Sequence, residues 1–177
     1  MATRFHNIRG ERTKELLAPG SNVRVSSISL INMRTPLSGV GAASSTCKVD
    51  LYIEKKLTGK FYILRNVSLP LDTTLTHDFT MDNTANEFGL YMKLTRGDTF
   101  TLTGTIDPAA STTVPGVGTA FTTELSVGDE ILVSTETRTV DSIASNTSLT
   151  VSSAFSNNAN DSTPDCNPEA MVDVIIS

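Results

Sequence analysis

Side chains that commonly carry acid–base or nucleophilic chemistry are scarce in this sequence. The chain has two histidines, His6 and His77, so a Ser–His–Asp triad would have to combine His77 with Asp78 or Asp50. His77 stands in a threonine-rich segment, and the chain has no GxSxG turn of the kind that exposes a serine nucleophile. The sequence therefore gives no support to nucleophilic catalysis.

Metal-binding and phosphate-binding patterns are missing as well. The two cysteines, Cys47 and Cys166, form no CxxC pair, and a zinc site needs more His and Cys ligands than the chain supplies. We predict two reduced, buried thiols in preference to a disulfide. The segment DNTANE, residues 82–87, lacks the spaced ligands of a calcium loop, and no GxxxxGK[ST] phosphate loop occurs.

Acidic side chains on the expected strands could be taken for the carboxylate pair of a hydrolase. They are Asp50, Glu54, Asp78, Asp82 and Glu87. Carboxylates that alternate along a strand usually form its solvated face, because burying an unpaired charge is strongly unfavourable. We therefore expect no enzymatic activity, no metal, no cofactor and no small-molecule ligand.

The composition indicates an all-β protein without a nucleic-acid or membrane partner. Hydrophobic residues make up 38% and charged residues 19% of the 177 residues, and serine, threonine and asparagine fill the deficit, as in strands with one wet face. The net charge of −5 and the absence of a basic stripe argue against nucleic-acid binding. The chain has neither a long apolar run nor a secretory signal, so we expect it to be made in a cytosol.

Residues 21–104 plus 169–177 are predicted to form an antiparallel β-sandwich, jelly-roll-like in outline. Val23, Val25, Ile28 and Leu30 alternate with polar residues, and the pair Ser26-Ser27 shifts the phase as a β-bulge would. The segments CKVDLYIEK, KFYILRNVSLP, TTLTHDFT and EFGLYMKLT read as further strands, the first two as a hairpin that ends before Pro70. Residues 33–45 are expected to be a loop.

The first 20 residues are predicted to be an extended N-terminal arm outside the core, because their apolar residues are sparse. The arm is expected to bind a neighbouring subunit through apolar anchors flanked by basic residues. These candidate interface residues are Arg4, Phe5, Ile8, Arg9, Arg12, Leu16 and Leu17. Removing residues 2–18 is accordingly expected to leave the stability of the sandwich nearly unchanged.

Residues 105–168 are predicted to form a small β-barrel-like module inserted in the last hairpin of the sandwich. That hairpin would pair TFTLTG, residues 99–104, with the closing strand EAMVDVIIS. Within the insertion, GDEILV, ETRTVDSI and SLTVSSAF alternate as strands, and the stretches on either side read as linkers. So small a unit buries little surface, so we expect it to depend on its host sheet or on a neighbour. Its expected core is Phe121, Leu125, Ile131, Val133, Val140, Ile143, Leu149, Val151 and Phe155.

Two segments carry a resemblance to proteins of tailed bacteriophages. GVGTAFTTELSVGDEILV together with TRTV and IASNTSLTVSSAF resembles a small β module of phage structural proteins, particularly from marine and cyanobacterial phages. DLYIEKKLTGKFYILRNVSLPLDTTL, the Gly97-Asp98 turn and the closing strand are similar to a phage β-sandwich pattern. The resemblance implies a structural virion protein, and it carries over no residue with a chemical role.

The function expected from these patterns is that of a non-enzymatic structural subunit of a phage virion. Capsid (head surface), neck and tail all accept such domains, and self-assembly into a homo-oligomer, with a trimer favoured, suits a domain that has no active site. The alternative is a receptor-binding or carbohydrate-binding module. Sugar-binding sites commonly stack an aromatic ring on the sugar, and Tyr52, Tyr62 and Tyr91 are the only polar aromatic residues, each explained by packing in a strand.

Overall fold

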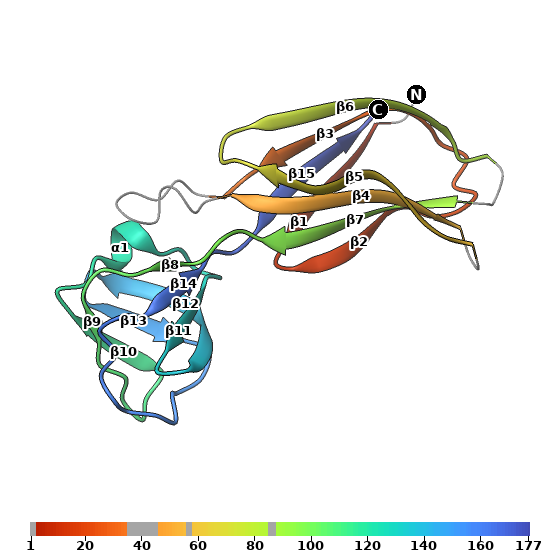
Figure 1. Cartoon of the computed structure of the whole chain (residues 1–177). Coiled ribbons are helices and arrows are strands. Elements are labelled where there is room, and N and C mark those ends of the chain that lie inside the picture. Colours follow the sequence, from red (N-terminus) through yellow and green to blue (C-terminus); the bar gives the residue numbers. More distant parts are fainter. Residues whose placement is uncertain (1–2, 35–45, 56–57, 85–87) are drawn as a thin grey trace. The chain divides into compact units, whose positions relative to one another are not determined.

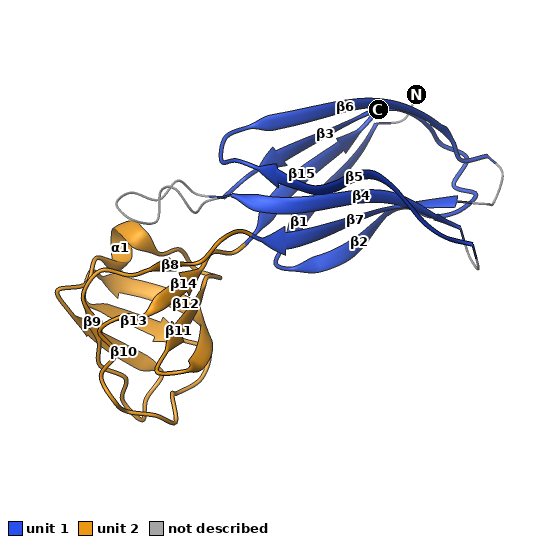
Figure 2. Ribbon diagram, in the orientation of Figure 1, with its two compact units in different colours: residues 1–34, 46–96, 170–177 blue, residues 35–45, 97–169 orange. Residues whose placement is uncertain are grey.

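A computed structural model describes residues 3–34, 46–55, 58–84 and 88–177. These described residues are all-β apart from one short helix, and the chain divides into two compact units. We call the first unit the sandwich (the described parts of 1–34, 46–96 and 170–177) and the second the module (Gly97–Glu169), as coloured in Figure 2. The predicted loop over residues 33–45 falls largely outside the described residues.

The sandwich consists of two four-stranded antiparallel sheets that face each other as two layers (Figure 1). The first sheet has the order β1 (Arg4–Arg9), β15 (Met171–Ile176), β3 (Arg24–Asn32) and β6 (Thr74–Asp82). The second has the order β2 (Arg12–Leu17), β7 (Phe88–Arg96), β4 (Cys47–Lys55) and β5 (Gly59–Leu69).

The predicted strands from β3 to β7 are confirmed, and so are two of their irregularities. The register of β3 shifts between Val25 and Ser27, where the bulge was expected. β5 ends at Leu69, directly before Pro70, which cannot donate to a ladder. Alternate residues such as Val49 and Leu51 point inward and form one core that draws on both sheets.

The prediction of an N-terminal arm is wrong, because these residues form strands β1 and β2. β1 pairs with β15, β2 pairs with β7, and Ile8, Leu16 and Leu17 belong to the sandwich core. The register of β2 shifts between Glu15 and Leu17, so both neighbouring leucines are buried. Each of the two strands buries so few residues that its alternation is weak when read along the sequence.

The predicted final hairpin is also wrong. The closing strand β15 lies between β1 and β3, whereas β8 (Phe100–Thr101) pairs with β14 (Asp165–Asn167) in the module. The chain leaves the sandwich from β7 in one sheet and re-enters it at β15 in the other. The inserted unit therefore joins two sheets, and it runs from Gly97 to Glu169 instead of from 105 to 168.

The module contains a seven-stranded antiparallel sheet and helix α1 (Phe121–Glu124). Its order is β8, β14, β11 (Glu130–Val133), β12 (Glu136–Ser145), β13 (Ser148–Val151), β10 (Thr113–Val117) and β9 (Thr105–Ile106). The order is open at both ends, so the described strands do not form the barrel-like closure that was predicted.

All nine predicted core residues of the module lie in one apolar cluster, with Ile143 at its margin. The supposed linkers contribute to the same cluster through Ile106, Val114 and Cys166, because β9, β10 and β14 lie within them. Two buried carboxylates fix the beginning and the end of the module. Glu124 accepts hydrogen bonds from the Thr103 backbone N–H (2.9 Å) and hydroxyl (2.5 Å), and Asp129 accepts one from the Glu169 N–H (2.8 Å).

Candidate interaction surface

The outer face of the sheet β1–β15–β3 carries an apolar surface, of which the sequence predicted only Phe5 as an interface residue. The inward position of Ile8 leaves Phe5 on the outer face of β1, where its side chain is 71% exposed. In register, Phe5 lies opposite Ile175 on β15, and Ile31 on β3 lies opposite Asp173. Three strands from the two ends of the chain therefore bring these residues together.

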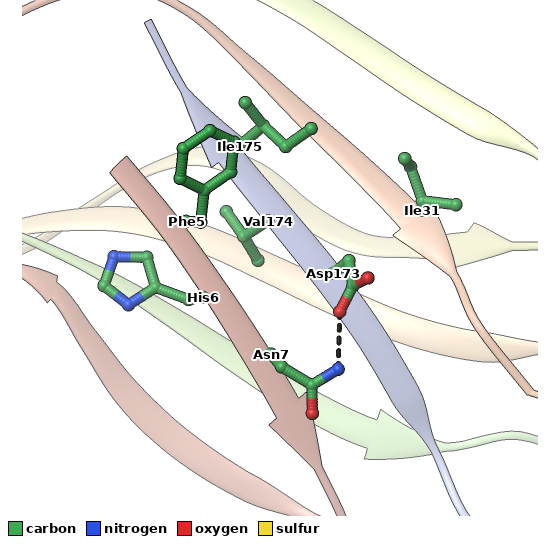
Figure 3. A pocket seen from close by; sticks show the side chains of 7 residues that line it. All are labelled: Phe5, His6, Asn7, Ile31, Asp173, Val174 and Ile175. Atoms are coloured by element: carbon green, nitrogen blue, oxygen red, sulfur yellow. Dashed lines mark hydrogen bonds between the residues drawn. The ribbon is translucent and has the colours of Figure 1, made fainter. Parts of the chain in front are cut away.

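A shallow depression of about 290 Å³ lies beside the Phe5 ring (Figure 3). In this depression a side-chain hydrogen bond connects β1 to β15: the Asn7 amide donates to Asp173 Oδ1 at 2.6 Å. A contact that covered this ring would remove its apolar area from water, which is favourable. The residues that line the depression are Phe5, His6, Asn7, Ile31, Asp173, Val174 and Ile175.

β1 is also the outermost strand of its sheet, so one of its edges pairs with no described strand. Arg4 and Arg9 are exposed at its two ends. Exposed charges on an edge strand oppose uncontrolled pairing with other edges and favour partners of opposite charge. The surface around Phe5 thus combines an apolar centre with a basic margin.

The structure divides the seven candidate interface residues into two groups. Ile8, Leu16 and Leu17 are buried in the core of their own sandwich, so their predicted role as anchors for a neighbour is wrong. The exposed residues are Arg4, Phe5, Arg9 and Arg12. Sequence reasoning missed Ile31, Asp173 and Ile175, although the alternation within the closing strand already separates Ile175 from the buried Val174 and Ile176.

His6 is half-buried on β1, and its surroundings change its protonation. Burial lowers its pKa, and the positive charges of Lys14 and Arg4 lower it further, while a hydrogen bond with the Leu16 backbone opposes them. Its Nε2 atom is buried without a hydrogen-bond partner. The neutral imidazole is therefore favoured in the folded sandwich.

The three tyrosines form a row on the outer face of the second sheet. Tyr52 on β4 lies in register with both Tyr62 on β5 and Tyr91 on β7, and its ring centroid is 5.5 and 5.7 Å from theirs. Lys60 lies over the Tyr52 ring at 4.5 Å. Tyr52 is consequently only 2% exposed, whereas Tyr62 is 46% exposed.

Tyr91 ends this row against the edge strand β2. Its hydroxyl donates a hydrogen bond of 2.9 Å to Glu15 Oε2. Burial, followed by this bond and the charge of Glu15, raises the pKa of Tyr91 to about 12. Sequence reasoning treated each tyrosine separately, and only the register of the three strands brings them together.

Of the residues considered for catalysis, His77 and Asp78 are consecutive on β6, where successive side chains point to opposite faces, and Asp50 lies in the other sheet. His77 stacks against Phe79, while Asp50, on β4, accepts a 2.6 Å hydrogen bond from the Asn66 backbone N–H. Glu87 lies outside the described residues. Nowhere in the described ranges do three or more His, Cys, Asp or Glu side chains gather as a metal site would require.

Both cysteines are free and buried, as predicted. Cys47 lies on β4 of the sandwich and Cys166 on β14 of the module. Burial raises the pKa of the Cys47 thiol to about 12, which keeps it protonated and unreactive at neutral pH. The described part of the chain contains no helix with the length and apolar character needed to cross a bilayer.

No protein-family model, curated protein or solved structure matches this chain. Its function is therefore inferred from its residues and their geometry.

Proposed function

We propose that this protein is a non-enzymatic structural subunit of a tailed-phage virion and that it assembles through protein–protein contacts. The observation that carries the proposal is the strand order of the sandwich. Numbered within the sandwich, its strands follow the orders 1-8-3-6 and 2-7-4-5, which correspond to an eight-stranded jelly roll. Viral capsid domains commonly use this fold, although a fold alone does not specify a function.

The apolar surface around Phe5 supports assembly more directly. A contact with a neighbour would bury the 71% exposed Phe5 ring together with the adjacent Ile31 and Ile175 on the same sheet face. We place the protein in the virion as a homo-oligomer, favouring a trimer, at the neck, the tail or the head surface. The resemblance to phage proteins gives the class of particle.

Quantitative mass spectrometry of purified particles of the encoding phage tests the proposal. We expect the protein in fixed stoichiometry with the major capsid or tail proteins, and light scattering of the purified chain should show a homo-oligomer. A chain that is produced during infection but missing from washed particles would refute the structural role. Phe5→Ala should lower occupancy in the particle, while Phe61→Ala, which changes another exposed aromatic of the sandwich, should not.

A carbohydrate-binding function is the second candidate, and the tyrosine row favours it. Aromatic side chains on one sheet face can stack on sugar rings, and Tyr62 offers an exposed ring beside Arg65, whose guanidinium lies 5.2 Å from it. If this candidate is correct, the chain should bind host-surface glycans on an array, and Tyr62→Ala should abolish the signal. Tyr52 lies in the middle of the row and is only 2% exposed, so stacking on the sugar depends chiefly on Tyr62.

A further inference from the structure

Electric charge is divided very unevenly between the two units. Residues 97–169 contain ten acidic residues and one basic residue, a net charge of −9. The rest of the chain contains 13 basic and nine acidic residues, a net charge of +4. The total of −5 therefore conceals an acidic module joined to a basic sandwich, and such units attract their counterparts in other copies.

The single basic residue of the module does little to neutralise its surface. Arg138 Nη2 lies 2.5 Å from Glu136 Oε2 and also donates to the Ala154 carbonyl at 3.0 Å. Its guanidinium lies over the Phe155 ring, 5.1 Å from the centroid. The remaining carboxylates thus give the module a negative field.

The module has a shallow hollow of about 190 Å³ on the outer face of β14, β11 and β12. Leu132 is 40% exposed there and lies in register between Thr137 and Asp165. The Thr101 hydroxyl donates a 2.8 Å hydrogen bond to Asp165 Oδ1, which orients that carboxylate. We call this site the Leu132 hollow; it is lined by Thr99, Glu130, Leu132, Thr137, Asp165, Cys166 and Asn167.

The surface around Phe5 has the opposite character. Phe5 is an exposed aromatic ring, Arg9 lies on the same outer face of β1, and the exposed Arg4 precedes Phe5 at the beginning of the strand. Aromatic and arginine side chains supply a large share of the binding energy in protein interfaces. A hollow that exposes Leu132 beside the carboxylates of Glu130 and Asp165 is therefore a matching receptor for an aromatic ring with an arginine on the same strand face.

We propose that Phe5 of one copy docks into the Leu132 hollow of a second copy of this chain, with Arg9 facing the carboxylates of Glu130 and Asp165. The inference rests on the proposed structural function and specifies its self-contact. Because the two surfaces lie on different units, each copy carries both a Phe5 surface, which we call the donor surface, and a Leu132 hollow, which we call the receptor. Such a head-to-tail contact closes into a ring when the rotation between copies permits it, and a trimer is one such ring.

Pairs of variants of the full chain test this contact by light scattering. Phe5→Asp disables the donor surface, and Leu132→Glu disables the receptor. Each variant alone should associate at least about tenfold more weakly than wild type, a difference of about 1.4 kcal/mol. An equimolar mixture should form a dimer that cannot grow, because one donor and one receptor remain intact between the two chains.

Matched controls and folding checks accompany these variants. Val127→Glu adds a charge at another exposed apolar residue of the module and should leave association unchanged. If Leu132→Glu does not fold, as judged by circular dichroism, Thr137→Lys obstructs the hollow from its exposed rim instead. Association of the wild type should weaken as salt is raised, because the charges at the contact are screened.

The outcomes separate this inference from the proposed function. Variants that self-associate like the wild type, or a mixture that does not form the dimer, overturn the contact while the structural role stands. A wild type that is monomeric in solution but present in particles in fixed stoichiometry likewise overturns the contact and leaves the structural role standing. A wild type that is monomeric in solution and missing from particles overturns both.

Discussion

Leu17→Ala should strongly destabilise the sandwich, because β2 is part of its core. Leu17 is 1% exposed and lies in register with Leu90 on β7. Replacing a fully buried leucine by alanine removes apolar burial and leaves a cavity, which together cost about 2–5 kcal/mol. A residue in a solvated tail would change the stability by less than about 0.5 kcal/mol.

Urea unfolding followed by tyrosine fluorescence measures this effect in the sandwich alone. The chain has no tryptophan, and its three tyrosines all lie on β4, β5 and β7. With an m-value of about 1.5 kcal/mol/M, a loss of about 3 kcal/mol lowers the midpoint by about 2 M. Thr13→Ala, an exposed position on the same strand, is the matched control and should leave the midpoint nearly unchanged.

Deletion of residues 2–18 extends the same test. It removes β1 and β2, and it turns β15 and β7 into unprotected edges. The tyrosine transition should then disappear, contrary to what the sequence suggested. A Leu17→Ala midpoint equal to that of the wild type, or a cooperative transition in the deletion variant, would show that these strands are dispensable.

Three further predictions concern a titrating base, the module and the tyrosine row. The pKa of His6 is lowered in the folded state, so neutral His6 is fully compatible with folding above pH 6.5, and stability is lost as the pH falls through 6.5 towards the folded pKa. The difference between the urea midpoints measured above and below pH 6.5 should therefore be smaller in His6→Gln than in the wild type. Gly104→Ala should unfold the module while leaving the tyrosine transition intact, because Gly104 has φ +83° and a Cβ there would lie 2.6 Å from backbone atoms. Gly118→Ala, with φ +66° and open space, should cost only the backbone strain of about 1–2 kcal/mol, as measured by circular dichroism. Ultraviolet titration should show a tyrosine ionising near pH 12, and Glu15→Gln should lower this pKa because it removes the negative charge beside the Tyr91 hydroxyl.

Local patterns predicted the strands that alternate over many residues. β3 to β7 and the strands β11 to β13 each keep an apolar face, and turn residues or proline mark their ends. The bulge near Ser26 and the core of the module could be read in the same way. Each of these features depends on side chains within one strand or hairpin, so the sequence by itself is sufficient.

The pairing of the chain ends could not be predicted in this way. The sequence assigned the closing strand β15 to the neighbouring TFTLTG, yet β15 lies between β1 and β3. The entropic cost of closing a loop grows slowly with loop length, so pairing with a strand that is distant in the sequence costs little more free energy than pairing with a near one. Burial of Val172, Val174 and Ile176 against the sandwich core therefore determines the partner.

The candidate interface depends on the same long-range pairing. β1 contains both Phe5 and Ile8, and the sequence does not show which of them faces water. The register that sets Ile8 opposite Val172 and Phe5 opposite Ile175 buries the isoleucine and exposes the phenylalanine. A slip of one residue would exchange the two faces of the strand. The sequence thus determined which apolar side chains β1 carries, and the packing of β1 against the closing strand determined that Ile8 is buried and Phe5 is exposed.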